Sequence, residues 1–358
     1  MNSRDRVKAA FEHKPHDRVP RHDTYWDDTI RRWSGEGLTG GREEALAVLG
    51  SDMQCVSPFP WPSPYPGRDE TVSEDDKTRI FKDEWGATLR LFKDHQTTPE
   101  HLGWECDAPE AWQGGIRRKV LETESPLDLE QNQARYARAC KEEKWTFFNT
   151  VEPFECLRKL IGDEETMIGI KEEPEWIIDM AEVTTTRSLQ TAQSLYEAGI
   201  HPDGLWIYGD MAFNHATFCS PADYKELIWP QHKRMCDWAH ERGMKTIYHT
   251  DGNVNGVIDL YIEAGIDVLQ PLECKAGMDI RDLVPAYGDR LGFFGNIDVM
   301  KLIRGDLGEI EEEIKAKFAA GMSINGYLYH SDHSIPPQVS WELYREIARL
   351  VEKHGNYV

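Results

Sequence analysis

The sequence predicts a (β/α)8 barrel, in which eight parallel strands alternate with helices. Three observations predict it: eight short segments rich in β-branched and aromatic residues, amphipathic segments between them, and glycines directly after the helical runs. The eight predicted strands span residues 19–23, 52–56, 146–151, 205–210, 245–250, 267–272, 291–296 and 327–331. An open doubly wound sheet is the alternative, but no G-x-G-x-x-G or phosphate-binding loop follows the first strand.

The predicted helices have recognisable ends. The three clearest span residues 174–199, 220–243 and 254–265, and each finishes in glycine, the residue most common just past a helix C-terminus. Ser220 followed by Pro221 opens the second of them with an N-cap and a proline in the first turn. Short links between these helices and the strands are typical of parallel βαβ units.

Residues 57–145 interrupt this alternation. They hold a proline-rich run, an acidic run and then polar helical sequence, so we interpret them as an insertion, with room for a hairpin, after the second strand of a single barrel domain over residues 1–358. Long insertions of this kind are often lids or substrate-binding elements. Phe59, Trp61 and Tyr65 could line the mouth of a pocket, and a rigid surface loop is the alternative.

The composition disfavours several classes of protein. A total of 41 Lys and Arg against 63 Asp and Glu gives a formal net charge of −22, which suits neither nucleic-acid binding nor a membrane surface. No segment approaches the roughly 18–20 apolar residues needed to span a bilayer, and the N-terminus lacks an apolar signal region. The seven cysteines are scattered, without C-x-x-C spacing, and suit a reducing compartment. We therefore expect a soluble cytoplasmic protein.

Ionisable and amide side chains gather at the C-terminal ends of the predicted strands. In the segment KTIYHTD, His249 and Asp251 occupy alternate positions and therefore point the same way. The other polar residues at strand ends are His22, Asp23, Glu152, Asp210, Glu273, Asn296, Asp298, His330, Asp332 and His333. These ends form the working face of a parallel barrel. Burying ionisable groups is costly unless they pair or bind a cation, so one shared site is expected.

Two interpretations of this cluster stay open. The first is a divalent metal, with zinc favoured by the imidazole and carboxylate ligands, held by His249, Glu273 and His333 with Asp251 as a further ligand. His330 is the alternative ligand from the last strand. The second interpretation is a hydrogen-bonded network of histidines and carboxylates that shapes a polar pocket without metal.

Several longer stretches carry a resemblance to a known family. They are RDRVKAAFEHKPHDRVP, DEWG, EPFECLRKLIGDEE, GDMAFNHATFCSPADYKELIWPQHKRM, YHTDGNV, DVLQPLE, GFFGNID and HSIPPQVSWE. Together they resemble the uroporphyrinogen decarboxylase-like superfamily, which includes corrinoid-linked methyltransferases such as the methylcobamide:coenzyme M enzymes. The stretches cover nearly the whole chain in the family's order, and the fold implied by the resemblance is also a (β/α)8 barrel.

The resemblance favours the methyltransferase branch. The true decarboxylase carries an arginine-rich signature of the R-Q-A-G-R type after its first strand, where this chain reads RHDTYWDDTIRRW. The methyltransferase branch holds zinc through an H-x-C pair and a late cysteine, and the matching positions here are His249, Asp251 and His333, with Glu273 at the position of a family glutamate. Both thiolates are replaced by oxygen or nitrogen ligands, which argues against thiol methyl acceptors such as coenzyme M.

The resulting hypothesis is a zinc-dependent methyltransferase that acts with a separate corrinoid-binding protein. The metal would activate the ether oxygen or amine of a small-molecule methyl donor, and the methyl group would pass to the Co(I) corrinoid of the partner. Asp210 or Asp298 would orient the substrate, and Tyr248 and Tyr329 would donate hydrogen bonds. Glu273 is expected to take part in catalysis as well as to bind the metal.

Further polar residues at the strand ends are expected to line the substrate and cofactor pocket. They are His22, Glu152, Asn296, Tyr329 and His330. A methoxylated aromatic compound is the donor class that the resemblance implies, and a homodimer is possible. The alternatives are a metal-free lyase of the decarboxylase type and a ligand-binding module without turnover.

Overall fold

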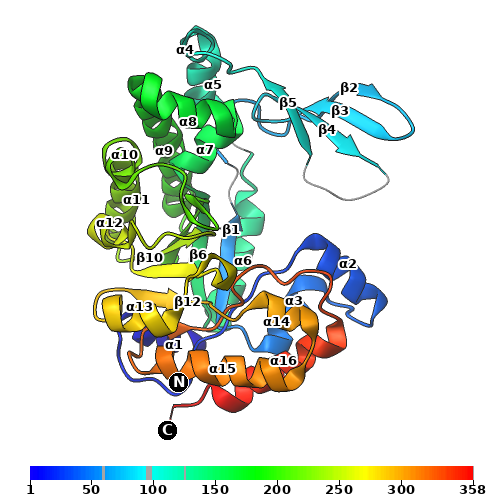
Figure 1. Ribbon diagram of the computed structural model, residues 1–358, viewed down its shortest axis with the longest axis vertical. Helices are drawn as coiled ribbons and strands as arrows, with labels where there is room; N and C mark the ends of the chain where they lie inside the picture. The colour runs from blue at the N-terminus through cyan, green and yellow to red at the C-terminus, as the bar shows by residue number, and fades with distance from the viewer. Residues whose placement is uncertain (59–60, 94–98, 125, 358) are drawn as a thin grey trace.

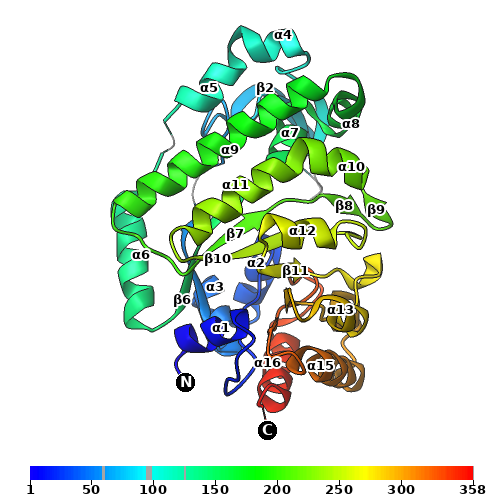
Figure 2. The same ribbon diagram turned by 90° about the vertical axis from the view of Figure 1, so that its left-hand side faces the viewer.

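The computed structural model describes residues 1–58, 61–93, 99–124 and 126–357. A curved parallel sheet lies at its centre in the order β1-β6-β7-β10-β11-β12-β13, and helices cover its outer face (Figures 1 and 2). The strands of this sheet are β1 (Met53–Pro58), β6 (Trp145–Val151), β7 (Gly204–Tyr208), β10 (Lys245–Thr250), β11 (Val268–Pro271), β12 (Gly292–Phe294) and β13 (Tyr327–Leu328).

An extended segment closes the barrel between the first and last of these strands. Arg21 forms an isolated parallel bridge with Tyr329, whose N–H donates to the carbonyl of Pro20 at 2.8 Å. On the other side, the carbonyl of Arg21 accepts from the N–H of Asp52 at 2.8 Å, directly before β1. The predicted barrel is therefore confirmed. Residues 19–23 form a bridge and not a regular strand, in part because Pro20 has no N–H to donate.

Helices alternate with the strands along the chain. Two of the three predicted helices are α9 (Pro174–Glu197) and α12 (Ile258–Ala264), and the third is divided into α10, the π-helical turn η2 and α11. The Oγ of Ser220 accepts from the N–H of Asp223, as expected for an N-cap. The other helices around the barrel are α1 (Ser3–Phe11), α2 (Asp27–Gly35), α3 (Gly41–Leu49), α7 (Pro153–Ile161), α8 (Asp163–Glu172), α10 (Pro221–Asp223), η2 (Tyr224–Ile228), α11 (Trp229–His240), η3 (Cys274–Ala276), α13 (Ile280–Tyr287), α14 (Val299–Arg304), α15 (Leu307–Met322) and α16 (Trp341–His354).

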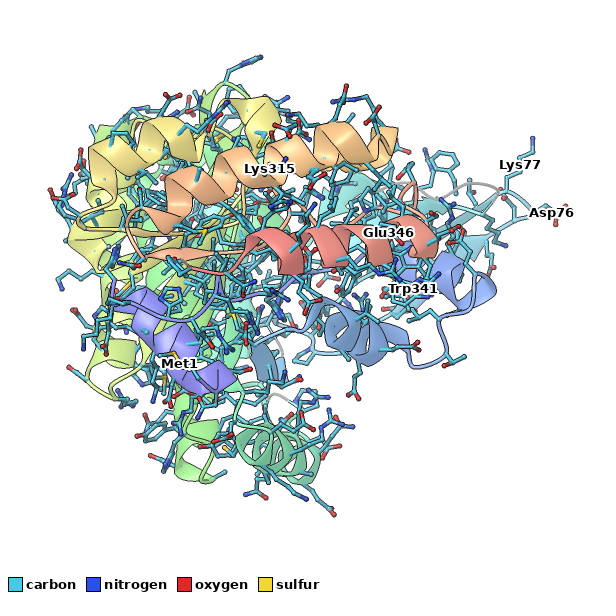
Figure 3. The ribbon with its side chains drawn as sticks, turned by 90° about the horizontal axis from the view of Figure 1, so that it is seen from below. Met1, Asp76, Lys77, Lys315, Trp341 and Glu346 are labelled. Carbon is cyan, nitrogen blue, oxygen red and sulfur yellow. The ribbon has the colours of Figure 1, made fainter. Side chains whose placement is uncertain are left out.

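Apolar side chains fill the lower half of the barrel, around the starts of the strands. The cluster consists of Met53, Trp145, Phe147, Trp206, Ile247, Val268, Phe294 and Leu328 from the strands, with Val7, Ala10 and Phe11 from α1. Phe11 stacks on Trp145 with ring centroids 5.1 Å apart. Seen from below, α1 lies at the base of the molecule beside α15 and α16 (Figure 3). The lower end of the barrel is thus packed with side chains, and the polar strand ends lie above this floor.

Between β1 and β6 the chain forms a four-stranded antiparallel sheet that extends away from the barrel (Figure 1). Its turn at Asp76 and Lys77 lies at the outer edge of the molecule in Figure 3. The elements of this segment are β2 (Glu70–Glu74), β3 (Thr78–Lys82), β4 (Ala87–Phe92), β5 (Glu100–Trp104), α4 (Pro109–Ala111), η1 (Trp112–Ile116), α5 (Arg117–Glu122) and α6 (Leu129–Lys141). Phe59, expected at a pocket mouth, lies outside the described residues. Among the helices described, none has the length and apolar character that crossing a bilayer requires.

Candidate functional site

Two neighbouring strands bring the principal site residues together. β7 and β10 pair in parallel with Tyr208 opposite His249, and each strand places an aspartate two residues further on, at Asp210 and Asp251. Ile247 belongs to the apolar cluster inside the barrel, so the alternation along β10 directs His249 and Asp251 toward the same interior. The two strand ends therefore present matching sets of polar side chains to one space.

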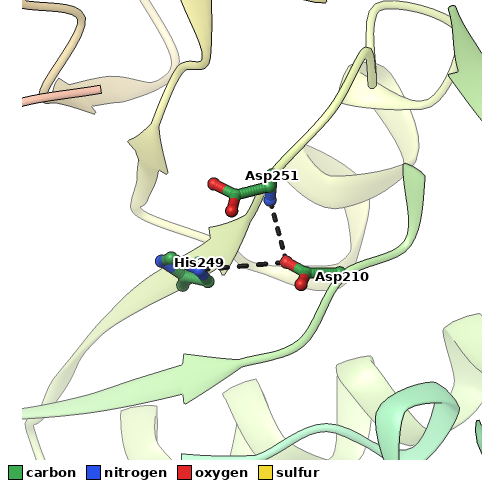
Figure 4. Close-up of side chains that lie close together, drawn as sticks. All are labelled: Asp210, His249 and Asp251. Carbon is green, nitrogen blue, oxygen red and sulfur yellow. Dashed lines mark hydrogen bonds and ion pairs between the residues drawn. The ribbon is translucent and has the colours of Figure 1, made fainter. Parts of the chain in front are cut away.

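Asp210, His249 and Asp251 form a compact group of potential metal ligands. One ligand atom from each lies within 4.8 Å of the others (Figure 4). The N–H of Asp251 donates to Oδ1 of Asp210 at 3.0 Å, and Nε2 of His249 lies 3.8 Å from the same oxygen. His333, in the loop after β13, places its Nε2 3.5 Å from Oδ2 of Asp251. Three separate strand ends thus contribute to one cluster.

The Asp251 carboxylate is incompletely satisfied by the protein. Burial raises its pKa, and the nearby charges of Asp210 and Glu273 act in the same direction, while His249 and His333 oppose the rise. Its Oδ1 is buried, and no group among the described residues forms a hydrogen bond with it. Buried acceptors in native proteins are usually paired, so an orphaned carboxylate oxygen beside two other ligand groups needs an explanation.

These side chains fit a zinc ion. One imidazole nitrogen and two carboxylates are ligands that zinc accepts, and His333 is near enough to serve as a fourth. Ligand atoms bonded at about 2.0–2.2 Å in a tetrahedral site lie roughly 3.3–3.6 Å apart. The 3.5 Å between His333 and Asp251 falls in this range, the 3.8 Å between His249 and Asp210 is slightly wider, and the triad as a whole, with its ligand atoms within 4.8 Å of one another, would have to draw together around an ion.

A cavity of about 490 Å³ opens beside the ligand group. Its walls include Asp210, Asp251 and Glu273 together with two aromatic residues. Phe213 ends β8 (Ala212–Phe213), and Phe218 directly follows β9 (Ala216–Thr217), the strand paired with it. Arg158 also lines the cavity and places its guanidinium 5.0 Å from the ring centroid of Phe218.

The positive charge of Arg158 is already balanced. Its Nη1 lies 3.0 Å from Glu155, and its Nε lies 2.7 Å from Asp163. The cavity therefore combines aromatic walls with a surplus of carboxylates at its inner end.

Glu273 lies at this cavity but outside the compact ligand group. Its Oε2 accepts from the N–H of Gly252 at 2.9 Å, and its Oε1 lies 2.7 Å from Nζ of Lys275. The structure thus brings His249, Asp251 and His333 together as candidate ligands, while Asp210 occupies the place expected for Glu273.

Three of the other predicted residues support loops. Glu152 is buried at the N-cap of α7, where it accepts from the N–H groups of Phe154 and Glu155 at 2.7 and 2.6 Å. The side-chain amide of Asn296 donates to the carbonyls of Leu272 and Met278, both at 2.6 Å. Asp298 caps α14 by accepting from the N–H of Met300 at 2.8 Å. Their side chains are thus committed to backbone groups around the site.

Tyr248 and Tyr329 are fully buried in the layer between the strands and the helices. The ring of Tyr248 packs against His232 and Tyr261, with centroids 5.0 and 4.9 Å away. Because His249 points into the barrel, its neighbour Tyr248 must point outward. The structure does not bring Tyr248 to the ligand group.

His22 and His330 lie deeper than the ligand group, above the apolar floor. Both rings contact Trp206, with centroids 6.0 and 6.4 Å away. Burial lowers the pKa of His22 to about 4 and the pKa of His330 to about 3, so both imidazoles are neutral near pH 7. His22 Nδ1 lies 2.9 Å from Oγ of Ser51.

Two residues beside His249 were missed in the sequence. Tyr208 stacks on the imidazole with centroids 4.8 Å apart, and Trp61 stacks on Tyr208 at 5.8 Å. Gln270 places Oε1 2.5 Å from Nδ1 of His249. The available signals were the repeat of Tyr-Gly-Asp and His-Thr-Asp at neighbouring strand ends, and a glutamine within the apolar run DVLQPL.

Comparisons with known proteins agree with this architecture. A solved structure described as a methyltransferase from Methanosarcina mazei has a TM-score of 0.67, with 15% sequence identity and 99% of each chain covered. The two proteins thus share a fold over their whole length. No curated protein sequence matches the chain significantly. The family model for uroporphyrinogen decarboxylase (URO-D) matches residues 146–354, more than half of the sequence. The chain belongs to the uroporphyrinogen decarboxylase (URO-D) family.

Proposed function

We propose that the protein is a metal-dependent methyltransferase that takes a methyl group from a methoxylated or methylated small molecule and transfers it to the Co(I) corrinoid of a partner protein. The observation that carries this proposal is the convergence of Asp210, His249 and Asp251 around a buried carboxylate oxygen that has no hydrogen-bond partner in the described part of the chain. The methyltransferase from Methanosarcina mazei, which has the same fold, supports the proposal.

Asp210, His249 and Asp251 would hold the metal, and the fourth position of a tetrahedral zinc, within reach of His333, would stay open to the donor atom. When bound, zinc supplies Lewis-acid polarisation of the oxygen or nitrogen atom that carries the methyl group. The two carboxylates would balance the charge of the ion, which removes the cost of burying two neighbouring anions. Tyr208 restrains the imidazole of His249 by stacking on it.

The cavity beside the ligands would receive the methyl donor. Phe213 and Phe218 provide apolar surface for the body of the donor and exclude water from the transferred methyl group. Asp210 and Asp251, at the inner end, place negative charge beside that position. A donor with a hydrophobic or aromatic body and an oxygen or nitrogen atom at its methylated end suits this arrangement.

Decarboxylation of a polycarboxylate is less well supported, although the family takes its name from such an enzyme. A substrate with several carboxylates needs cationic partners, and Arg158 in the cavity is already paired with Glu155 and Asp163. The carboxylates of Asp210 and Asp251 would repel such a substrate.

Two measurements test the proposal. Purified protein should bind one zinc per chain, and the His249→Ala/His333→Ala double variant should lose it. The zinc-loaded protein should then convert Co(I) cobalamin to methylcobalamin, followed by absorbance, when it is given a panel of methoxylated aromatic compounds and methylated amines. Protein that binds no zinc, or that gives no methylcobalamin with any donor, would contradict the proposal, and a chain that releases CO₂ from a carboxylated substrate would support a lyase.

A further inference from the structure

A row of buried hydrogen bonds connects the loop after β13 with the candidate metal ligand His249. It consists of the carbonyl of Ser331, the imidazole of His330, the side-chain amide of Gln270 and the imidazole of His249, and we call it the Gln270 relay. Gln270 and His330 are 1% and 0% exposed, so water does not compete for these groups. Gln270 and His249 are direct neighbours on the paired strands β11 and β10.

The relay starts at the carbonyl of Ser331, which can accept a hydrogen bond but cannot donate one. The carbonyl oxygen of Ser331 lies 2.5 Å from Nδ1 of His330, so that nitrogen must carry a proton and donate it. Burial lowers the pKa of His330 and keeps the ring neutral. A neutral imidazole with a proton on Nδ1 has a lone pair on Nε2. The Nε2 atom of His330 is therefore an acceptor.

The orientation of the Gln270 amide follows from this acceptor. Nε2 of His330 lies 3.5 Å from Nε2 of Gln270 and 3.2 Å from the hydroxyl of Thr24, two groups that can donate to it. With its NH₂ group directed at His330, Gln270 turns its carbonyl oxygen toward Nδ1 of His249, 2.5 Å away. That oxygen can only accept, so Nδ1 of His249 must donate.

We infer that Gln270 is a positioning residue that holds His249 in the tautomer with a proton on Nδ1 and leaves the lone pair of Nε2 free for a metal. Asp210 alone would favour the opposite tautomer, because its Oδ1 lies 3.8 Å from Nε2 of His249 and would accept a hydrogen bond from that nitrogen if it carried a proton. Gln270 opposes this from the other side of the ring. The inference rests on the proposed metal site for its purpose, but the tautomer is a property of the metal-free protein.

The tautomer can be observed directly by NMR. Metal-free protein labelled with ¹⁵N-histidine should give a long-range ¹H–¹⁵N spectrum in which His249, identified by its absence from the His249→Ala spectrum, is protonated on Nδ1. In Gln270→Met, which keeps the size but removes the amide, His249 should shift toward the Nε2-protonated form. Zinc affinity, measured by competition with a chelator, should fall about 10–100-fold, the usual cost of losing a group that orients a metal ligand.

Gln231→Met is the matched control, because Gln231 is also buried but lies in α11 and bonds to Arg234. It should change neither the tautomer nor zinc affinity. Gln270→Glu retains an acceptor facing His249, so it should preserve the Nδ1 proton and bind zinc within about threefold of the unmodified protein. This variant also serves if Gln270→Met does not fold.

Three results would overturn the relay: a proton on Nε2 of His249 in the unmodified metal-free protein, a proton on Nε2 in Gln270→Glu, or unchanged zinc affinity in Gln270→Met. A different result would affect only the proposed function. If His249 carries its proton on Nδ1 but the unmodified protein binds no zinc, the relay stands and the metal-dependent mechanism fails.

Discussion

Two groups of histidine and aspartate side chains lie at strand ends of this barrel, and they differ in how well their polar atoms are satisfied. In the first, Asp23 and His330 have side chains that are 0% and 1% exposed. Oδ1 of Asp23 accepts from the hydroxyl of Ser331 at 2.6 Å, and Oδ2 accepts from the hydroxyl of Tyr344 at 3.3 Å. The polar atoms of Asp23 are thus satisfied by protein groups, and we call this group a closed network in that sense, although the Gln270 relay connects its His330 to His249.

The second group, Asp210, His249 and Asp251, is open. These side chains are 27%, 17% and 24% exposed, and Oδ1 of Asp251, although buried, has no hydrogen-bond partner among the residues that the structure describes. The residue types in the two groups are the same. The two groups differ in whether their polar atoms have hydrogen-bond partners within the protein. A group with such partners stabilises the fold, whereas a group that lacks them is available to bind a ligand.

The largest expected difference between the two groups is in zinc binding. Asp251→Ala removes a ligand and should lower zinc affinity by at least about 100-fold, more than the loss of an outer group costs. Asp23→Ala should change zinc affinity by less than about threefold, because every hydrogen bond of Asp23 stays within the closed network. Competition with a chelator of known affinity measures both, and similar losses in the two variants would remove the distinction.

For the free energy of unfolding, Asp23→Ala should have the larger effect and Asp251→Ala the smaller one. Asp23→Ala removes one acceptor of the buried hydroxyls of Ser331 and Tyr344, which keep only the carbonyl of His333 and the hydroxyl of Tyr25, so the free energy of unfolding should fall by about 1–3 kcal/mol. Asp251→Ala removes a carboxylate that has an unpaired oxygen, and the metal-free protein should lose much less. Urea unfolding of metal-free samples compares them. Equal destabilisation would mean that the open group also supports the fold.

The closed network should also make stability depend on pH. Burial raises the pKa of Asp23 to about 7, against an ordinary value of 3.8. Between these values the folded protein holds a proton that the unfolded chain has released, so stability falls as pH rises from about 4 to about 7. Asp23→Asn cannot release a proton, and its stability should fall less over this range, by roughly 1–3 kcal/mol. Urea unfolding of both proteins at a series of pH values measures this. If Asp23 has an ordinary pKa, the unmodified protein and Asp23→Asn will show the same dependence of the unfolding free energy on pH.

The smallest expected effect belongs to Asp251→Asn without metal. Removing one of the neighbouring charges relieves repulsion with Asp210 and Glu273, so the free energy of unfolding should stay the same or rise by up to about 1 kcal/mol. Zinc at 100 times its Kd should stabilise the unmodified protein by about 2.7 kcal/mol and this variant much less. Thermal unfolding with and without zinc provides the comparison, and a marked loss of stability in the metal-free variant would argue against an open group.

The barrel could be predicted from the sequence because its strands and helices follow simple patterns. Strand residues 245–250 lie within the predicted bounds, and Gly265 ends its helix in the left-handed conformation as expected. The conformation of residues 19–23 was harder to predict. This segment contains Pro20 and closes the barrel through only a few hydrogen bonds. The four-stranded sheet between β1 and β6 was not foreseen beyond a hairpin, because β2 is exposed and β3 half-buried along its whole length, so neither shows an alternating apolar pattern.

The candidate site could be predicted only in part. Alternation along β10 placed His249 and Asp251 together, since two residues on one strand need no tertiary information. The position of Asp210 beside them depends on the register between β7 and β10, and the turn of Glu273 toward Lys275 depends on a loop. Neither is encoded in local periodicity. Asp23 and Asp251 likewise look equivalent in the sequence, because the partners that satisfy Asp23 come from residues more than 300 positions away.

The helix α1 has a consequence for the order of events in catalysis. Val7, Ala10 and Phe11 belong to the apolar cluster that fills the lower end of the barrel, and the cavity at the strand ends lies on the opposite side. A small methyl donor and a much larger corrinoid protein would then have to share one entrance. If the proposed reaction takes place at this site, the donor enters first, and the demethylated product leaves only after the larger partner has dissociated. Steady-state kinetics should accordingly follow a compulsory-order ternary-complex scheme.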